Sequence, residues 1–241
     1  MDNLSIIAMI PARIGSTRLK MKNLALLDGK PLISYAIKAA KETGIFNRIV
    51  INSDHQVFKK IANRYHVEFY QRPIELGSSD TKSDNVVIDF IEKHPCDIIA
   101  WVNPTSPLQK AIEINEIVKY FLCEKLDSLI TVKNEQVHCI YNEKPINFSF
   151  NEIFSQTQDL NPAQTFVYSV MMWRSKSFIR EFEKNGHAFF CGKTGYFPVS
   201  KQSSVIIKNK TDLLIAECLL KAENIGSSDI VKYDLISEIL Q

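Results

Sequence analysis

Four cationic residues lie within ten positions near the start of the chain: Arg13, Arg18, Lys20 and Lys22. Gly15 and Ser16 lie between them. A phosphate group is bound by positive charge and by backbone N–H groups that can close on it. Arg13 can offer a planar pair of donors, and Lys22 a compact charge. The segment therefore indicates either phosphate binding or a solvated basic loop, and its composition alone leaves both interpretations open.

The elements that must position this segment alternate between strand and helix. Short β-branched apolar runs, typical of buried parallel strands, occur at residues 6–10, 49–51, 98–102 and 129–132. Apolar residues at helical spacing lie between them, over residues 33–40, 58–65 and 114–121. This alternation predicts an α/β fold with a mostly parallel twisted sheet and helices on both faces. Ligands bind at the carboxyl ends of such strands, so we expect the site in the loops after Ile10, Ile51 and Val102.

Neither of two common phosphate-binding patterns, GxxxxGK[ST] and GxGxxG, occurs in the cationic segment. It instead resembles the first motif of acylneuraminate and 3-deoxy-octulosonate cytidylyltransferases, roughly I-P-A-R-x-G-S-x-x-x-x-x-K-N. The matching residues are Ile10, Pro11, Ala12, Arg13, Gly15, Ser16, Lys22 and Asn23. Later motifs of that family follow in order at residues 29–33, 52–54, 72–76 and 103–108. The resemblance implies a nucleotide-diphospho-sugar transferase-like fold. The length of 241 residues indicates one domain over residues 1–241.

The same resemblance implies a nucleotidyltransferase reaction. CTP would activate a 2-keto-3-deoxy acid sugar, a sialic-acid-like nonulosonate, to give a CMP-sugar and pyrophosphate. Arg13 and Lys22 would neutralise phosphate oxygens during catalysis. Gly15 and Ser16 would donate backbone N–H groups, and Asn23 would approach the nucleotide.

The resemblance places Arg72 and the whole loop 80–83 against the cytosine base. Arg72 follows the run 67–71, and Ser83 ends the loop 80–83. Arg72 could instead be an ordinary surface cation and Ser83 a helix cap. For Ser83 both interpretations stay open, whereas the matching motif favours function for Arg72.

The sugar end of the site is implied by four further residues: Asn103, Tyr168, Phe189 and Phe190. Asn103 takes the place of a glutamine that reaches the sugar in the family, and it keeps the same donor and acceptor groups. Tyr168 alone remains of the family's N-G-x-x-Y pattern. Phe189 and Phe190 match a phenylalanine pair that lines a pocket for an N-acyl group, but two core residues of a hairpin explain them equally well.

The metal-binding carboxylates of the resembled enzymes are missing. Their D-x-D pair falls on Ile206 and Lys208. A protonated lysine cannot bind a metal ion, so we expect Lys208 to act in catalysis as an electrostatic substitute. Mg²⁺ would then be held mainly by the triphosphate. Two alternatives remain: a protein of this fold that binds nucleotide or sugar without catalysis, and an enzyme that uses another nucleotide or another acid sugar.

Residues 134–170 interrupt the α/β pattern and predict a small β-rich arm. Strands are expected at 137–141 and 148–150, then at 166–172 and 203–207, followed by a helix at 211–220 and a weakly amphipathic tail at 230–240. Large apolar residues are concentrated in the arm: Ile140, Tyr141, Ile146, Phe148, Phe150 and Phe154. A short strand pair cannot bury so many, so we expect a homodimer that pairs through the arm, as the resemblance also implies.

The overall composition excludes several other classes of protein. The 29 basic and 27 acidic residues leave a net charge of +2, which argues against a general nucleic-acid binder. Five cysteines without a CxxC pair predict reduced thiols and a cytoplasmic location. The N-terminus lacks the pattern of a signal peptide, and the apolar runs are too short to span a bilayer, so no membrane partner is expected.

Overall fold

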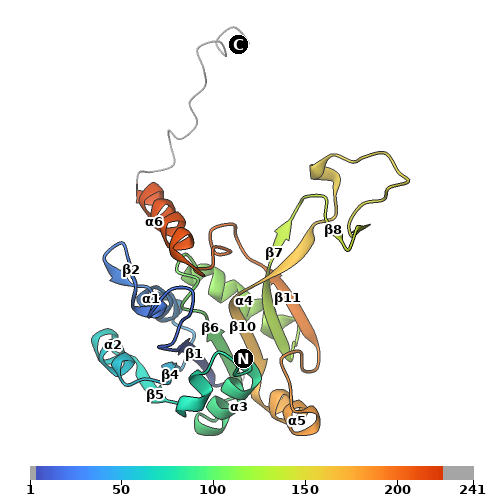
Figure 1. Ribbon diagram of the computed structural model, residues 1–241. Helices are drawn as coiled ribbons and strands as arrows, with labels where there is room; N and C mark the ends of the chain where they lie inside the picture. Colours follow the sequence, from blue (N-terminus) through green and yellow to red (C-terminus); the bar gives the residue numbers. More distant parts are fainter. Residues whose placement is uncertain (1–3, 225–241) are drawn as a thin grey trace.

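A seven-stranded sheet lies at the centre of the computed structural model, which describes residues 4–224 (Figure 1). Its strands, in order across the sheet, are β11 (Thr194–Pro198), β7 (Ser128–Glu135), β10 (Ala163–Arg174), β6 (Ile98–Val102), β1 (Ile6–Ala12), β4 (Arg48–Ser53) and β5 (Glu68–Gln71). β1 is parallel to β4 and β6, and β4 is parallel to β5. β10 is antiparallel to β6 and β7, whereas β11 is parallel to β7. The sheet is thus mixed and mostly parallel, and the carboxyl ends of β1, β4 and β6 meet at one edge.

Helices cover both faces of this sheet. One face carries α1 (Ile33–Thr43), α2 (Val57–Tyr65) and α4 (Ala111–Cys123), and the other carries α3 (Ser83–Lys93) and α5 (Ser175–Asn185). Alternate residues of β1 separate the two layers: Ile6, Ala8 and Ile10 join the first core, whereas Ile7 and Met9 join the second. Burial on both faces explains the unbroken apolar run of β1. Within residues 4–224, no helix is both long and apolar enough to span a bilayer.

The expected elements are largely confirmed. The predicted strands of the N-terminal half lie within β1, β4, β6 and β7, the strand at 166–172 lies within β10, and the helix at 211–220 lies within α6 (Lys210–Asn224). Two predicted strands are wrong. Residues 148–150 form a bend and a turn, and residues 203–207 form a turn and an extended segment that joins no sheet. There the N–H of Ile207 donates to the Thr105 carbonyl at 2.8 Å, a single bond to a loop. The tail at 230–240 lies outside the described residues.

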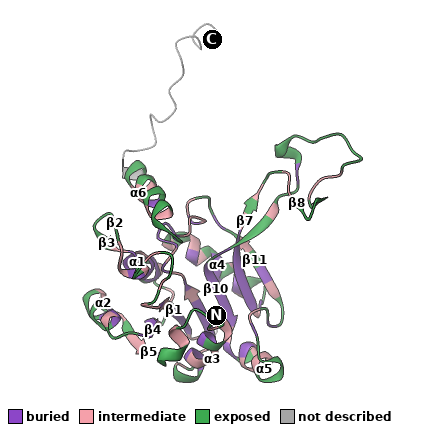
Figure 2. Cartoon of the chain, viewed as in Figure 1, coloured by how far each residue is buried: buried purple, intermediate pink, exposed green. Residues whose placement is uncertain are grey.

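The far ends of β7 and β10 leave the sheet as a two-stranded arm that carries residues 136–162 (Figures 1 and 2). Of the strand predicted at 137–141, only β8 (Ile140–Tyr141) forms, paired with β9 (Lys144–Pro145). Large apolar side chains of the arm are more than half exposed: Ile140, Tyr141, Ile146, Phe150, Ile153 and Phe154. The ring of His138 stacks on Phe154 and meets Phe148 edge-on, so the arm has only a small aromatic cluster of its own.

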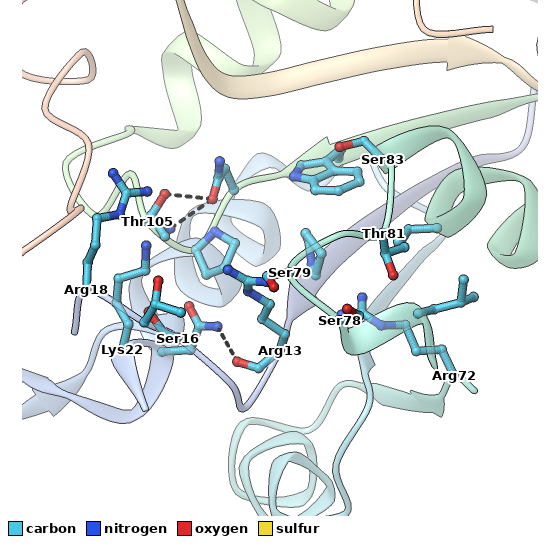
Figure 3. A pocket seen from close by; sticks show the side chains of 18 residues that line it. Arg13, Ser16, Arg18, Lys22, Arg72, Ser78, Ser79, Thr81, Ser83 and Thr105 are labelled. Atoms are coloured by element: carbon cyan, nitrogen blue, oxygen red, sulfur yellow. Dashed lines mark hydrogen bonds between the residues drawn. The ribbon is translucent and has the colours of Figure 1, made fainter. Parts of the chain in front are cut away.

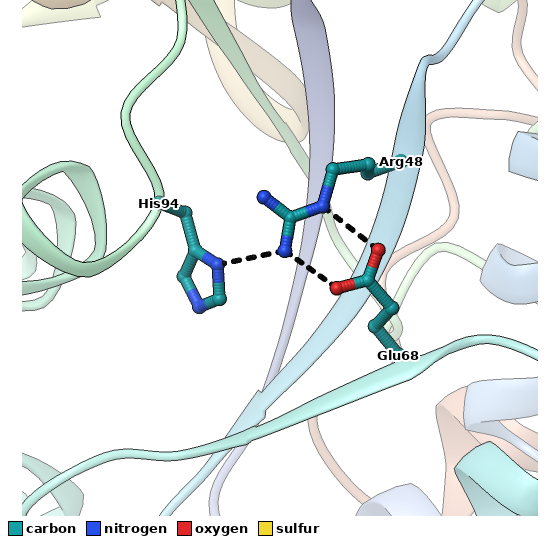
Figure 4. A network of polar contacts seen from close by, with 3 residues as sticks. All are labelled: Arg48, Glu68 and His94. Carbon is teal, nitrogen blue, oxygen red and sulfur yellow. Dashed lines mark hydrogen bonds and ion pairs between the residues drawn. The ribbon is translucent and has the colours of Figure 1, made fainter.

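A polar network ties β4, β5 and the end of α3 together at the amino-terminal edge of the sheet, opposite the predicted site (Figure 4). Arg48 Nε and Nη2 donate to the two carboxylate oxygens of Glu68, at 2.8 and 2.5 Å. Arg48 Nη2 also lies 3.1 Å from His94 Nδ1. Since the guanidinium can only donate, Nδ1 must be the acceptor and His94 is neutral here. Burial, and then the charge of Arg48, lower the pKa of His94, although Glu68 opposes them.

This network predicts a pH dependence of stability. The lowered pKa of His94 means that the unfolded chain takes up a proton on this residue at a higher pH than the folded chain. The free energy of unfolding should therefore fall as pH drops below about 6.5, the ordinary histidine pKa. His94→Gln should remove this component. Urea unfolding at neutral and mildly acidic pH measures it, and an equal pH dependence in both proteins would contradict the assignment.

Candidate active site

A cavity of about 320 Å³ lies at the carboxyl edge of the sheet (Figure 3). Most residues that the sequence assigned to the nucleotide line it, together with one assigned to the sugar: Arg13, Ser16, Lys22, Asn23, Arg72, Ser83 and Asn103. They come from the loops that follow β1, β5 and β6 and from the start of α3. The strand order therefore brings together side chains that are up to ninety positions apart in the chain, from Arg13 to Asn103.

The loop after β1 is held in place by a buried carboxylate. The N–H of Ile14 donates to Asp54 Oδ1 at 3.0 Å, and Asn23 Nδ2 donates to the carbonyl of Arg13 at 3.3 Å. Asp54 follows β4 and is only 9% exposed. A Cβ atom at Gly77 would lie 2.2 Å from Asp54 Oδ2, so the close approach of the backbone at residue 77 to Asp54 requires glycine. Asp54 thus positions the loop, a role that its place in a matched motif did not reveal.

At Gly15, by contrast, the fold itself does not require glycine. Its φ lies outside the left-handed region, and nothing lies within 4 Å of where its Cβ would be. Any need for glycine at this position must come from a ligand close to the backbone, because the turn itself does not demand it.

Lys22 links this loop to the segment before α6. Its Nζ donates to the carbonyl of Ile207 at 3.0 Å. The pKa of Lys22 is lowered to about 8, first by burial and then by the charges of Arg18 and Arg13. The ammonium is therefore surrounded by other cations and retains donors for an anion.

Arg72 lies at the opposite end of the cavity from Lys22 (Figure 3). It is only 5% exposed, so the alternative of an ordinary surface cation is wrong. Nη1 donates to the Asn52 carbonyl at 3.3 Å, and no residue of 4–224 bonds Nε. Burial lowers its pKa, while the charges of Asp54 and Asp89 act in the other direction. A buried guanidinium with spare donors is suited to hold a ligand oxygen or nitrogen.

Several lining residues were not assigned from the sequence. They include Thr17, Arg18, Ser78, Ser79, Trp101 and Thr105. The indole N–H of Trp101 is buried without a partner among the described residues, another donor at the cavity wall. In the sequence Trp101 is one apolar residue of a buried strand, which hides this position. The N-cap residue of α3 is Lys82, so the helix-cap alternative for Ser83 is wrong.

Asn103 shapes its own loop. Its Nδ2 donates to the carbonyl of Tyr168 at 3.1 Å, and its Oδ1 accepts from the N–H and the hydroxyl of Thr105 at 3.0 and 2.9 Å. Tyr168 has a φ of 60°, in the left-handed region that such residues rarely adopt, at an irregularity where β10 leaves its partner β7. Asn103 therefore couples the cavity to the distorted part of β10.

The cavity lining does not include the other three residues assigned to the sugar, Tyr168, Phe189 and Phe190. The two phenylalanines differ in burial and packing. Phe189 packs edge-on against the buried Trp173, with ring centroids 5.4 Å apart, as a core residue would. Phe190 is 54% exposed and lies 6.1 Å from the ring of Phe166. The same ring contacts those of Tyr168 and Tyr196, so an exposed aromatic cluster adjoins the Asn103 loop.

The residues present do not fit a divalent metal held by the protein. Ile206 packs against the main core, and Lys208 carries no carboxylate. Asp212 Oδ2 already accepts the N–H groups of Lys208 and Asn209, at 2.7 and 2.9 Å. These bonds fix the backbone just before α6. The described part of the chain holds no group of three or more His, Cys, Asp or Glu side chains that could bind a metal. Lys208 itself is not part of the cavity lining.

Comparison with known proteins gives this geometry a context. The N-acylneuraminate cytidylyltransferase of Escherichia coli O18:K1:H7 is 28% identical over 245 aligned positions, covering 93% of the chain and 54% of that enzyme. The post-translational flagellin modification protein B of Campylobacter coli is 25% identical, covering 93% of the chain and 98% of that protein. The chain therefore spans about half the length of the first relative and nearly all of the second.

The fold is also that of known enzymes. A CMP:2-keto-3-deoxy-manno-octonic acid synthetase in complex with CTP superposes with a TM-score of 0.69 at 12% identity, covering 91% of the chain and 99% of that structure. A 4-diphosphocytidyl-2C-methyl-D-erythritol synthase from Anaerococcus prevotii gives 0.63 at 11% identity, covering 91% and 100%. The family model described as cytidylyltransferase matches residues 7–225. This match spans nearly the whole chain, which therefore belongs to the cytidylyltransferase family of enzymes.

Proposed function

We propose that this protein transfers CMP from CTP to the anomeric hydroxyl of a 2-keto-3-deoxy acid sugar, a nonulosonate related to sialic acid. The hydroxyl oxygen attacks the α-phosphorus and loses its proton, the bond from that phosphorus to the β-phosphate bridge breaks, and pyrophosphate leaves. The observation that carries the proposal is one cavity, in a cytidylyltransferase chain, that is lined by Arg13, Lys22 and Arg72. Relatives named N-acylneuraminate cytidylyltransferase support the class of sugar.

In this proposal the nucleotide lies along the cavity. Arg13 and Lys22 neutralise phosphate oxygens, and the backbone of Gly15 and Ser16 donates to them. Arg72 and Ser83 face the base at the other end of the cavity, while Asn23 fixes the loop after β1 through the carbonyl of Arg13. Positioning and neutralisation of charge are the protein's main contributions in such phosphoryl chemistry.

Cytidylyltransferases of this family generally use a divalent metal. Because the described residues do not fit a protein-held ion, we propose that Mg²⁺ enters with CTP as part of the substrate.

The acid sugar would lie beyond Asn103, next to the exposed aromatic cluster of Phe166, Tyr168, Phe190 and Tyr196. An apolar acyl substituent would pack against such rings. Phe189, as a core residue, would support Phe190 from behind. Asp84 holds the backbone of this segment in place, because its Oδ1 accepts the N–H groups of Ala188 and Phe189 at 2.6 and 2.8 Å.

A second candidate is a protein that binds nucleotide or sugar without catalysis. The replacement of the expected metal carboxylates by Ile206 and Lys208 favours it. Turnover separates the two candidates, because only the first predicts it.

The remaining parts of the proposal concern assembly and location. The exposed apolar side chains of the arm would be covered by a second copy of the chain, which would make a homodimer. The five cysteines are unpaired, as expected for a cytoplasmic enzyme.

Turnover is the first test. With CTP, Mg²⁺ and a panel of acid sugars that includes N-acetylneuraminate, the protein should release pyrophosphate in step with sugar consumption. Arg13→Ala should lower kcat/KM at least ~10-fold, because it removes charge-assisted hydrogen bonds. Lys59→Ala, on the exposed face of α2, is the matched control and should behave as the parent. CTP binding without turnover on any sugar would favour the non-catalytic candidate.

The lowered pKa of Lys22 gives a second test. With a pKa of about 8, Lys22 is charged at neutral pH and loses its proton as pH rises through that value. CTP affinity measured by calorimetry should therefore fall between about pH 7 and about pH 9.5. Lys22→Arg remains charged throughout, so its affinity should change much less. An equal decline in both proteins would remove Lys22 from the phosphate site.

Light scattering tests the assembly. We expect twice the chain mass of 27.5 kDa at micromolar concentration. The double change Ile140→Asp and Phe150→Asp should give monomers, because a charge on each exposed apolar contact opposes pairing. Ile112→Asp, at an equally exposed position on α4, is the control. A monomeric parent would contradict the proposed role of the arm.

A further inference from the structure

One end of the cavity is rich in positive charge. Arg18 and Lys22 lie together with Thr105 at this end, away from Arg72 (Figure 3). Among residues 4–224 no carboxylate forms an ion pair with Arg18, and no hydrogen bond engages its guanidinium. A guanidinium at a cavity wall with all its donors available is arranged for an anion that has yet to bind.

Lys208 is held next to this end by its neighbours in the chain. The N–H of Ile207 donates to the carbonyl of Thr105 at 2.8 Å, and the carbonyl of Ile207 accepts from Lys22 Nζ at 3.0 Å. The backbone before α6 is thereby fixed between the loop after β1 and the loop after β6. The charge of Lys208 is near enough to contribute to the lowered pKa of Lys22.

The carboxylate whose charge acts on Lys22 already accepts hydrogen bonds from the backbone. Asp212 attracts Lys22, but its Oδ2 accepts two backbone N–H groups, those of Lys208 and Asn209. This one negative charge lies among four positive charges, those of Arg13, Arg18, Lys22 and Lys208. The excess of positive charge is suited to a strongly anionic group, and the described residues provide no carboxylate set that would hold a metal ion in its place.

We infer that Arg18, Lys22 and Lys208 form a site for the β- and γ-phosphates of the nucleotide, and that these cations take over charge neutralisation that carboxylate-held metal supplies elsewhere. The identity of the nucleotide rests on the proposed function. As the bond to the α-phosphorus breaks, its electron pair passes to the bridging oxygen, and the three cations stabilise the charge that the departing pyrophosphate gains. Free pyrophosphate, the product, should bind at the same place.

Calorimetry in EDTA tests this site without turnover. The parent should bind CTP and inorganic pyrophosphate without any divalent metal. Arg18→Ala and Lys208→Ala should each weaken both ligands by ~10-fold, the loss of one charge-assisted contact. Affinity for CMP, which lacks these phosphates, should not change. Lys20→Ala is the matched control and should bind as the parent, because Lys20 belongs to the same loop but neither lines the cavity nor is among the charges that act on Lys22. Arg18→Lys and Lys208→Arg should restore part of the affinity.

Lys208→Asp provides a second readout. It should abolish CTP binding in EDTA and recover part of it when Mg²⁺ or Mn²⁺ is added, because the carboxylate can now help to hold a metal. Unchanged affinity of Arg18→Ala and Lys208→Ala for CTP and pyrophosphate would overturn the site, whatever the turnover. Binding of pyrophosphate that is weakened by both variants, without turnover on any sugar, would support the site and reject the proposed reaction.

Discussion

Repulsion among the cations of one loop is the constraint on which the active site depends. Two unit charges about 4 Å apart near a protein surface repel each other by ~4 kcal/mol, so such side chains separate unless the fold holds them. Burial is the largest cause of the lowered pKa of Lys22, and the charges of Arg18, Arg13 and Lys208 lower it further. In the proposed function, a phosphate group bound in the cavity would remove this repulsion.

The fold holds these charges through a few backbone contacts. Asp54 accepts the N–H of Ile14 and fixes the start of the loop, and Gly77 leaves room for that carboxylate. The carbonyl of Ile207 accepts from Lys22 and fixes its end. Asp54 reaches the loop because β1 and β4 are parallel neighbours. Ile207 reaches it because its N–H donates to Thr105 in the loop after β6, the other parallel neighbour of β1. A larger residue at Gly77 should therefore displace Asp54 and disturb the loop after β1.

The sequence predicted the sheet and the helices well, because strands buried on both faces give unbroken apolar runs that are easy to identify, as in β1 and β6. It predicted the cationic loop, since charge and glycine are concentrated there. It did not predict the position of residues 203–207, whose β-branched residues indicated a strand but which form one backbone bond to Thr105. Nor did it reveal the roles of Asp54 and Trp101. Asp54 lies in a matched motif and Trp101 in a predicted strand, but a hydrogen bond to a backbone N–H and a place at a cavity wall leave no pattern in composition or spacing.

A crystal structure of the protein with CTP and Mg²⁺ tests the central claim most directly, because it locates the nucleotide. The account predicts the triphosphate over the loop from Arg13 to Asn23, with its terminal phosphates within hydrogen-bond distance of Arg18 and Lys22 and the base beside Arg72. It also predicts a magnesium ion bonded to phosphate oxygens and water, without a carboxylate of the chain. A triphosphate bound elsewhere, or a magnesium ion held by two or more carboxylates of the chain, would contradict it.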